Sequence, residues 1–207
     1  MDQKTHWEGV YGKKKVTETS WYQKIPLTSL TLIENAALHE DEAIIDVGGG
    51  ASTLVDHLLT AGYQNLTVLD ISSKALENAR LRLLDREGEV AWIDADVTDF
   101  DSQATYDLWH DRAVFHFFTQ PEQRRAYVAS LMRHLKPRGH AIIATFAIDG
   151  PTRCSNLEIV RYTPEALHQE LGPQFELLET ITETHITPSN KKQSFVYCRF
   201  RRRPGEP

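Results

Sequence analysis

The sequence is poor in the residues that build disulfide frameworks and metal sites. Its 207 residues hold only two cysteines, Cys154 and Cys198, and they form no Cys-x-x-Cys pair. The nine histidines show no zinc-ligand spacing, so we expect no metal. No apolar run approaches the roughly 20 residues that a membrane span needs, and the first residues lack the apolar core of a signal peptide. These absences predict a cytoplasmic protein without membrane contact.

Positive charge is also scarce, since 23 Lys and Arg face 29 Asp and Glu, for a net charge of -6. We therefore expect no nucleic-acid partner, because phosphate backbones are bound by clustered Lys and Arg. The one basic run, residues 199–203, is interrupted by Phe200 and is interpreted as a solvated strand end. The length suits a single α/β domain with short appendages.

From Ala43 onward, short apolar runs alternate with amphipathic stretches. Strands are expected at residues 43–47, Leu66–Asp70, 90–93, 106–111 and 140–146. Helices are expected at residues 52–61, 72–86, 121–135 and Pro164–Leu171. This alternation predicts an α/β fold with a doubly wound, mostly parallel sheet covered on both faces. Residues 175–187 and 193–201 predict a hairpin that adds an antiparallel strand at the C-terminus.

The first 42 residues stand apart from this pattern. A helix is expected over residues 25–38, preceded by an aromatic-rich segment with Trp7, Tyr11, Trp21 and Tyr22. Large aromatics are depleted in disordered segments, so we expect this segment to pack on the sheet. We divide the chain into an N-terminal helical segment, residues 1–42, and a ligand-binding domain, residues 43–207. Residues 1–24 are predicted to form a lid.

The sharpest local signal is the run Asp46-Val47-Gly48-Gly49-Gly50-Ala51-Ser52, between a predicted strand and a predicted helix. Ligands of doubly wound sheets bind at such a strand end. The run lacks the lysine of a P-loop, and Thr53 stands where a dinucleotide fingerprint needs Gly or Ala. Asp46 suits a ligand with a positive or hydrogen-bond-donating group. Asp70 ends the second strand, where a carboxylate accepts hydrogen bonds from ribose hydroxyls.

Four segments together resemble the class I S-adenosylmethionine-dependent methyltransferases over nearly the whole chain. They are DVGGGAS (46–52), LTVLDIS (66–72), IDADVTDF (93–100) and YDLWHDRAVFHFF (106–118). The resemblance implies a Rossmann-like fold with seven strands, the last one antiparallel. It also implies a transferase whose cofactor is S-adenosyl-L-methionine.

The resemblance further implies which residues hold the methyl donor. The glycine loop, with Asp46, Gly48, Gly49 and Gly50, would cradle it, and Asp70 would hold its ribose. Adenine would pack on Ile71, and Asp96 would contact its amine beside Val97. Tyr22, with Trp21, is a candidate aromatic wall against the sulfonium, as in cation–π contacts, or an anchor of the N-terminal segment.

Methyl transfer is an in-line displacement, in which the protein mainly aligns the acceptor and excludes water. A base is needed only for an acceptor that arrives protonated. His110 and Asp111 at the end of the fourth strand, and His116 beyond it, are the candidate catalytic residues. The alternative is structural: Asp111 and Arg112 cap or pair locally, and His116 packs between Phe115 and Phe117.

We expect a methyltransferase that acts on a small molecule. The segments W-x-x-x-Y (Trp7 to Tyr11) and Ser20-Trp21-Tyr22 resemble, more loosely, a subgroup that includes some protein-lysine methyltransferases, so a protein lysine is the alternative acceptor. A non-catalytic module that binds the donor remains a third reading. A nicotinamide oxidoreductase is disfavoured by Thr53 and Asp46.

Overall fold

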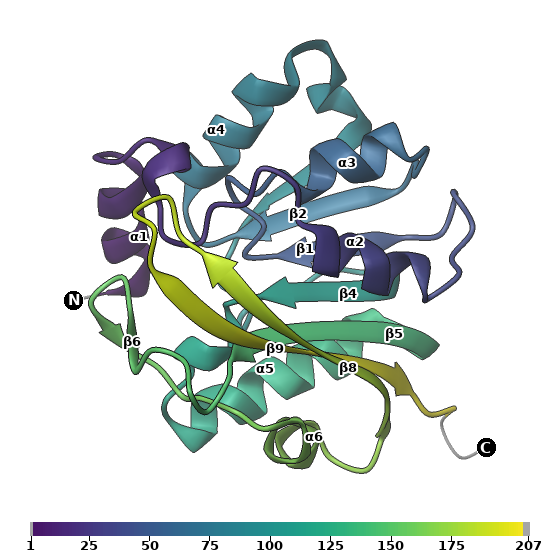
Figure 1. The fold of residues 1–207 in the computed structure, drawn as a ribbon. Helices are drawn as coiled ribbons and strands as arrows, with labels where there is room; N and C mark the ends of the chain where they lie inside the picture. The colour runs from purple at the N-terminus through teal and green to yellow at the C-terminus, as the bar shows by residue number, and fades with distance from the viewer. Residues whose placement is uncertain (1, 205–207) are drawn as a thin grey trace.

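The computed structural model describes residues 2–204. Met1 of the predicted N-terminal segment and residues 205–207 of the predicted ligand-binding domain therefore lie outside the described residues. At its centre is a seven-stranded sheet in the order β3-β2-β1-β4-β5-β9-β8 (Figure 1). Its strands are β1 (Ile44–Val47), β2 (Leu66–Asp70), β3 (Val90–Asp94), β4 (Tyr106–Arg112), β5 (Leu135–Phe146), β8 (Phe175–Ile186) and β9 (Lys192–Arg202).

The strand order confirms the predicted doubly wound, mostly parallel sheet. β1 pairs in parallel with both β2 and β4, and β5 runs parallel to β4. β9 is antiparallel to β5 and to β8, as the predicted hairpin requires. The chain leaves β1 toward β2 and β3, then crosses back to β4, so the order reverses between β1 and β4. Ligands of open α/β sheets bind at the carboxyl ends of the strands beside such a reversal.

Helices cover both faces of the sheet. One core contains side chains of α2 (Leu27–Glu34), α3 (Leu54–Thr60) and α4 (Ser73–Leu83). The other contains side chains of α5 (Pro121–His134) and α6 (Pro164–Leu171). The parallel strands β1 and β2 are therefore buried on both faces, which explains their nearly continuous apolar sequences. Thr163 caps α6, because its side chain accepts a hydrogen bond from the Ala166 amide.

Several boundaries differ from the prediction. The helix expected over residues 25–38 ends at Glu34, and Ala37 turns the chain with φ 53°. The helix expected over 72–86 ends at Leu83, and a 3₁₀ helix, Leu84–Glu89, follows. β5 begins at Leu135, five residues before the expected strand, because the α5 helix passes directly into it.

The aromatic N-terminal segment contains a helix that the sequence did not indicate, α1 (Gln3–Tyr11), and a 3₁₀ turn at Val16–Glu18. Only Trp7, Val10 and Tyr11 have the spacing of an apolar helix face, and three residues are too few to predict a helix. A two-stranded hairpin, β6 (Arg153–Cys154) and β7 (Leu157–Glu158), was also not predicted. In Figure 1, α1 and β6 lie on the same side of the sheet.

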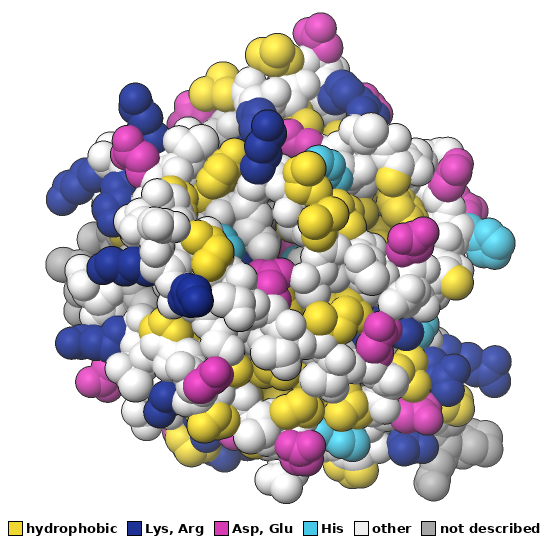
Figure 2. All heavy atoms as spheres, in the orientation of Figure 1, with side chains coloured by type: hydrophobic (Ala, Val, Ile, Leu, Met, Phe, Trp, Pro, Cys, Tyr) yellow, Lys and Arg dark blue, Asp and Glu magenta, His cyan; other side chains and the backbone are white. Residues whose placement is uncertain are grey.

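The basic run at the C-terminus is held by the protein's own groups. Arg199 and Arg201 on β9 pair with Glu179 and Glu176 of β8 at 2.9 and 3.0 Å. The Arg202 guanidinium donates to the carbonyl of Met132. In Figure 2, acidic side chains are interspersed among the basic ones on this face. Within residues 2–204, none of the helices has the length and apolar composition to cross a bilayer.

Candidate active site

The glycine loop joins β1 to α3, at the carboxyl edge of the sheet. Gly48 has φ +65°, and a Cβ on it would lie 2.1 Å from Cγ2 of Val114. Gly50 has φ +27°, and a Cβ there would lie 2.3 Å from Oδ2 of Asp70. Positive φ and the lack of room both exclude side chains. The loop therefore packs closely against the turn after β4 and against the end of β2.

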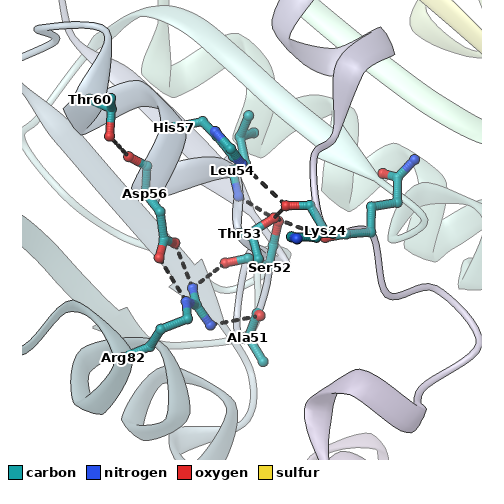
Figure 3. A network of polar contacts seen from close by, with 10 residues as sticks. Lys24, Ala51, Ser52, Thr53, Leu54, Asp56, His57, Thr60 and Arg82 are labelled. Carbon is teal, nitrogen blue, oxygen red and sulfur yellow. Dashed lines mark hydrogen bonds and ion pairs between the residues drawn. The ribbon is translucent and has the colours of Figure 1, made fainter.

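A polar network fixes the far end of this loop (Figure 3). Arg82 on α4 donates to the carbonyls of Ala51 and Ser52 at 3.1 and 2.6 Å. The same guanidinium binds both oxygens of Asp56 on α3, at 2.8 and 2.7 Å. Figure 3 also shows the hydroxyl of Thr53 reaching the main chain of the N-terminal segment, where it donates to Gln23 at 3.0 Å. The loop is thus held from both sides before any ligand binds.

A first cavity of about 750 Å³, partly open to solvent, lies beside the loop. It contains five of the predicted donor residues: Gly48, Asp70, Ile71, Asp96 and Val97. The remaining lining is mostly apolar and aromatic. It comes from α1, the N-terminal segment, the ends of β1, β2 and β4, the segments that follow β3 and β4, and β6: Gln3, Trp7, Tyr11, Trp21, Val47, Leu69, Ala95, Arg112, Ala113, Val114, Phe117, Phe118 and Cys154.

Asp70 is the buried acid of this cavity, with 6% of its surface exposed. Its Oδ1 accepts a 2.8 Å hydrogen bond from the Ser72 amide, and its Oδ2 faces Gly50. Burial raises the pKa of Asp70 to about 7, and the charge of Asp46 adds to the rise while the Ser72 bond opposes it. The carboxylate is therefore short of hydrogen-bond donors, which the hydroxyls of a ligand would supply.

Ile71 and the Asp96–Val97 segment lie at one end of the cavity. Asp96 accepts hydrogen bonds from the amide and hydroxyl of Thr98 through Oδ1, at 2.8 and 2.7 Å. Its other oxygen has no hydrogen-bond partner among the described residues. Val97 is buried, and Ile71 is half-buried. Two apolar side chains beside a carboxylate oxygen suit a flat ring that bears an amine.

The α1 helix covers part of the first cavity. Trp7 packs edge-to-face on Trp21 and Phe117, with ring centroids 5.7 and 5.2 Å apart. Polar contacts tie the helix to three different parts of the domain. Lys4 pairs with Asp94, Glu8 accepts from the Ser73 amide at the start of α4, and His6 contacts the Ser155 hydroxyl beside β6.

A second cavity of about 520 Å³ adjoins the first and shares Tyr11, Trp21, Gly48 and Arg112 with it. It contains the predicted residues Asp46, Gly49, Tyr22 and His110, whereas Gly50 lines neither cavity. His110 lies between Oδ1 of Asp46 at 2.7 Å and the hydroxyl of Ser29 at 2.9 Å.

Asp111 and His116 have no exposed surface and line neither cavity. Asp111 accepts hydrogen bonds from the amides of Val114 and Phe115, so it caps the turn after β4. Burial raises the pKa of Asp111 to about 6, although the Tyr127 bond lowers it. Burial lowers the pKa of His116 to about 3, helped by the charge of Arg112, so the ring is neutral. His116 packs against Phe117 and Phe146.

Arg112, Ser29 and the pair Phe117–Phe118 line the cavities without having been assigned to the site from the sequence. The β4 motif contains Arg112, Phe117 and Phe118, but its sequence does not predict which of these side chains point toward the cavities. No group of three or more His, Cys, Asp or Glu within residues 2–204 is arranged to hold a metal ion.

A family model described as "Methyltransferase domain" matches residues 45–141. EEF1A lysine methyltransferase 2 of Danio rerio is 28% identical over 195 residues, covering 86% of this chain and 77% of that protein. Malonyl-[acyl-carrier protein] O-methyltransferase of Anoxybacillus flavithermus is 31% identical over 111 residues, covering 53% of this chain and 40% of that protein. The similar curated proteins thus include a lysine methyltransferase and an O-methyltransferase named for a malonyl group on an acyl-carrier protein.

Solved structures share the fold. One, described as "Conversion of a Disulfide Bond into a Thioacetal Group during Echinomycin Biosynthesis", superposes with a TM-score of 0.80 at 20% identity, covering 98% of this chain and 93% of that chain. The N-methyltransferase NodS from Bradyrhizobium japonicum WM9, in complex with S-adenosyl-L-homocysteine, gives a TM-score of 0.73 at 16% identity, covering 97% and 99%. Both agree with the Rossmann-like sheet predicted from the sequence.

Proposed function

Because the chain belongs to the class I S-adenosylmethionine-dependent methyltransferases, we propose that its first cavity binds this donor and that the enzyme methylates a small molecule. The observation that supports the donor site best is the meeting of Gly48, Gly50 and Asp70 at one edge of the sheet. The glycines leave no room for side chains, and the buried Asp70 lacks donors for its second oxygen.

The donor fits the cavity in one direction. Oδ2 of Asp70 accepts the ribose hydroxyls, and adenine lies between Ile71 and Val97 with its amine toward Asp96. The backbone of the glycine loop then faces the amino-acid end. S-adenosylmethionine supplies a sulfonium whose methyl carbon is the electrophile, so the chain itself needs to supply only alignment and a dry environment.

The aromatic lining provides that environment. Trp7, Trp21 and Phe117 all line the first cavity, and Trp7 of α1 packs against the other two rings. Tyr22 contributes to the second cavity beside Gly49. An electron-rich ring face near a sulfonium stabilises its charge.

The catalytic assignment of His110, Asp111 and His116 stays a prediction. Of the three, only His110 lines a cavity, so it is the candidate for contact with a ligand. Asp111 and His116 support the β4 end from within the core, and we propose that they position the turn that contains Val114.

A small-molecule acceptor is favoured by the partial enclosure of the first cavity and by where its carboxylates lie. Its two carboxylates, Asp70 and Asp96, both lie at the proposed adenosine end. A lysine ammonium that enters the first cavity would find no carboxylate there, outside that end, to take its proton. The lysine alternative rests on the Danio rerio relative, whose similarity extends over 86% of this chain.

The test is to incubate the enzyme with methyl-labelled donor and a cell extract divided by size into protein and small-molecule fractions. We expect label in the small-molecule fraction. Label confined to protein would replace our proposal with the lysine alternative. Donor binding by calorimetry without transfer to either fraction would indicate the non-catalytic module, and no donor binding at all would reject the site. Asp70→Asn is the control that should lose donor binding.

A further inference from the structure

Arg112 is the last residue of β4 and the only Lys or Arg among the residues that line the two cavities. Its guanidinium is held in place by neutral groups. Nε donates to the Tyr197 hydroxyl at 2.7 Å, and Nη1 donates to the Trp21 carbonyl at 3.0 Å. Its central carbon lies 4.6 Å from the centroid of the Phe195 ring. The cation is thus fixed at the junction between the cavities.

The charge of Arg112 has no hydrogen-bonded counter-ion. The nearest carboxylate is Glu183, whose Oε1 lies 3.9 Å from Nη2, beyond hydrogen-bond distance. Glu183 accepts instead from the Thr28 hydroxyl at 2.5 Å and the Gln23 amide at 3.0 Å. Nη2 is buried and has no hydrogen-bond partner among the described residues. Buried guanidinium groups are normally hydrogen-bonded to an acceptor, so Arg112 has one long ion pair with Glu183 and a nitrogen, Nη2, without an acceptor.

We propose that Arg112 is an anion-binding residue that takes a carboxylate where the two cavities meet. A guanidinium matches a planar carboxylate with two parallel hydrogen bonds, a geometry that a lysine cannot reproduce. The other charged group of the second cavity, Asp46, lies beside Gly48 and suits an ammonium. The inference rests on the proposed function, because it assumes that a donor occupies the first cavity.

Two molecules in the reaction can bring this carboxylate to Arg112. One is the methyl donor, whose amino-acid end carries a carboxylate. The other is the acceptor, which would then be an anionic small molecule. Both would reach the junction, because the glycine loop and Trp21 border the two cavities together.

Binding calorimetry separates these sources. The probes are S-adenosylhomocysteine, which has the amino-acid carboxylate, and 5′-methylthioadenosine, which lacks it. If the donor supplies the anion, Arg112→Gln lowers the affinity for S-adenosylhomocysteine roughly tenfold or more. The affinity for 5′-methylthioadenosine then stays within about twofold of the wild-type value. If the acceptor supplies it, both affinities stay unchanged, and benzoate binds the S-adenosylhomocysteine complex of the wild type but not that of Arg112→Gln.

The inference is overturned if Arg112→Gln lowers the affinities for both nucleosides equally. It is also overturned if neither affinity changes and benzoate binding is unchanged as well. Failure of 5′-methylthioadenosine to bind the wild type would instead reject the donor site itself. Glu183→Gln keeps the guanidinium and removes the nearest negative charge, so it should tighten the binding of the carboxylate-bearing probe. This second variant keeps the test decisive if Arg112→Gln does not fold.

Discussion

The hydroxyl of Tyr127 on α5 donates a 2.6 Å hydrogen bond to Oδ2 of Asp111 at the end of β4. Tyr127 in turn accepts a 2.9 Å hydrogen bond from the indole of Trp109. Asp111 also caps the amides of Val114 and Phe115, so one buried chain links α5 to the turn that borders the first cavity. The position of Val114 over Gly48 depends on this chain.

Tyr127→Phe is expected to lower the free energy of unfolding by about 1–3 kcal/mol at pH 8, because the Asp111 carboxylate loses a buried donor. The pKa of Asp111 is already raised to about 6, and losing the bond raises it further. The ionised form of Asp111 is the one that the lost hydrogen bond had stabilised. The destabilisation should therefore be smaller at pH 5, where the carboxyl is largely protonated. Urea denaturation at both pH values measures the difference.

Tyr162→Phe is the matched control for this variant. Its ring also packs on Phe115, but its buried hydroxyl has no hydrogen-bond partner among the described residues. We expect the unfolding free energy of Tyr162→Phe to be unchanged or slightly higher. A loss of equal size in the two phenylalanine variants, or one independent of pH, would show that the Asp111 bond contributes little.

A second prediction concerns the pH dependence of donor binding. The pKa of Asp70 is raised to about 7 by burial, whereas an unfolded aspartate titrates near 3.9. Ribose hydroxyls donate to the ionised form, so affinity for S-adenosylhomocysteine should rise between pH 6 and pH 8 and proton release should accompany binding at pH 6. Calorimetry in buffers with different ionisation enthalpies measures both. A flat affinity across this range would contradict the role of Asp70.

Asp70→Asn supplies the control, because its amide cannot ionise and its affinity should be low and independent of pH. The sign for stability is opposite. A raised pKa favours the protonated folded state, so the contribution of Asp70 to stability declines as pH rises from about 4 through 7. Asp70→Asn should therefore gain in stability over the wild type across that interval, as thermal unfolding at pH 5 and pH 8 would show.

The proximity of the glycine loop to Asp70 could be predicted because its signals are local. Gly48 and Gly50 mark a strand-to-helix turn, and Asp70 ends the next strand, so their positions follow from element order alone. The contact between Asp46 and His110 could not be predicted, because it depends on strand register. Asp46 and His110 are paired across β1 and β4, and that pairing, rather than their separation in sequence, produces their hydrogen bond.

The same limit explains Asp111 and Arg112. The sequence places both at the end of β4. Successive side chains of a strand point to opposite faces, and the motif does not indicate which face borders the ligand. Asp111 turns into the core toward Tyr127, whereas Arg112 turns toward the cavities. The lining of the first cavity by α1 depends on contacts with Phe117, far along the chain, which no local pattern contains.

A third prediction addresses the close approach of the glycine loop. Gly50→Ala should abolish detectable donor binding, because the added methyl would lie 2.3 Å from Oδ2 of Asp70 and the residue has a positive φ. The variant should also lose about 1–3 kcal/mol of stability from backbone strain. Gly88→Ala is the control, since a Cβ there meets no atom within 4 Å. Equal donor affinities in the two variants would reject the proposed position of the ligand.

The last prediction concerns α1 as a lid. The helix is joined to the domain by exposed or half-exposed polar contacts, His6 with Ser155 at 3.2 Å and Glu8 with the Ser73 amide at 2.6 Å, and by the aromatic contacts of Trp7. Surface polar contacts stabilise little, so we propose that the segment opens when the cavity is empty and that a bound ligand adds the missing apolar contact.

Hydrogen exchange of residues 2–24, with and without S-adenosylhomocysteine, tests this proposal. We expect protection to rise on binding, and Trp7→Ala to remove most of that rise and to increase the ligand's dissociation rate, because the indole covers the cavity. Gly9→Ala is matched to it on the same helix and meets no atom within 4 Å, so its exchange should not lose ligand dependence. Strong protection in both states would make the segment part of the permanent core, and absence of protection in both would make it a tail. Either result would remove the physical basis for water exclusion by α1, since a cover must both close over the donor and open to admit the acceptor.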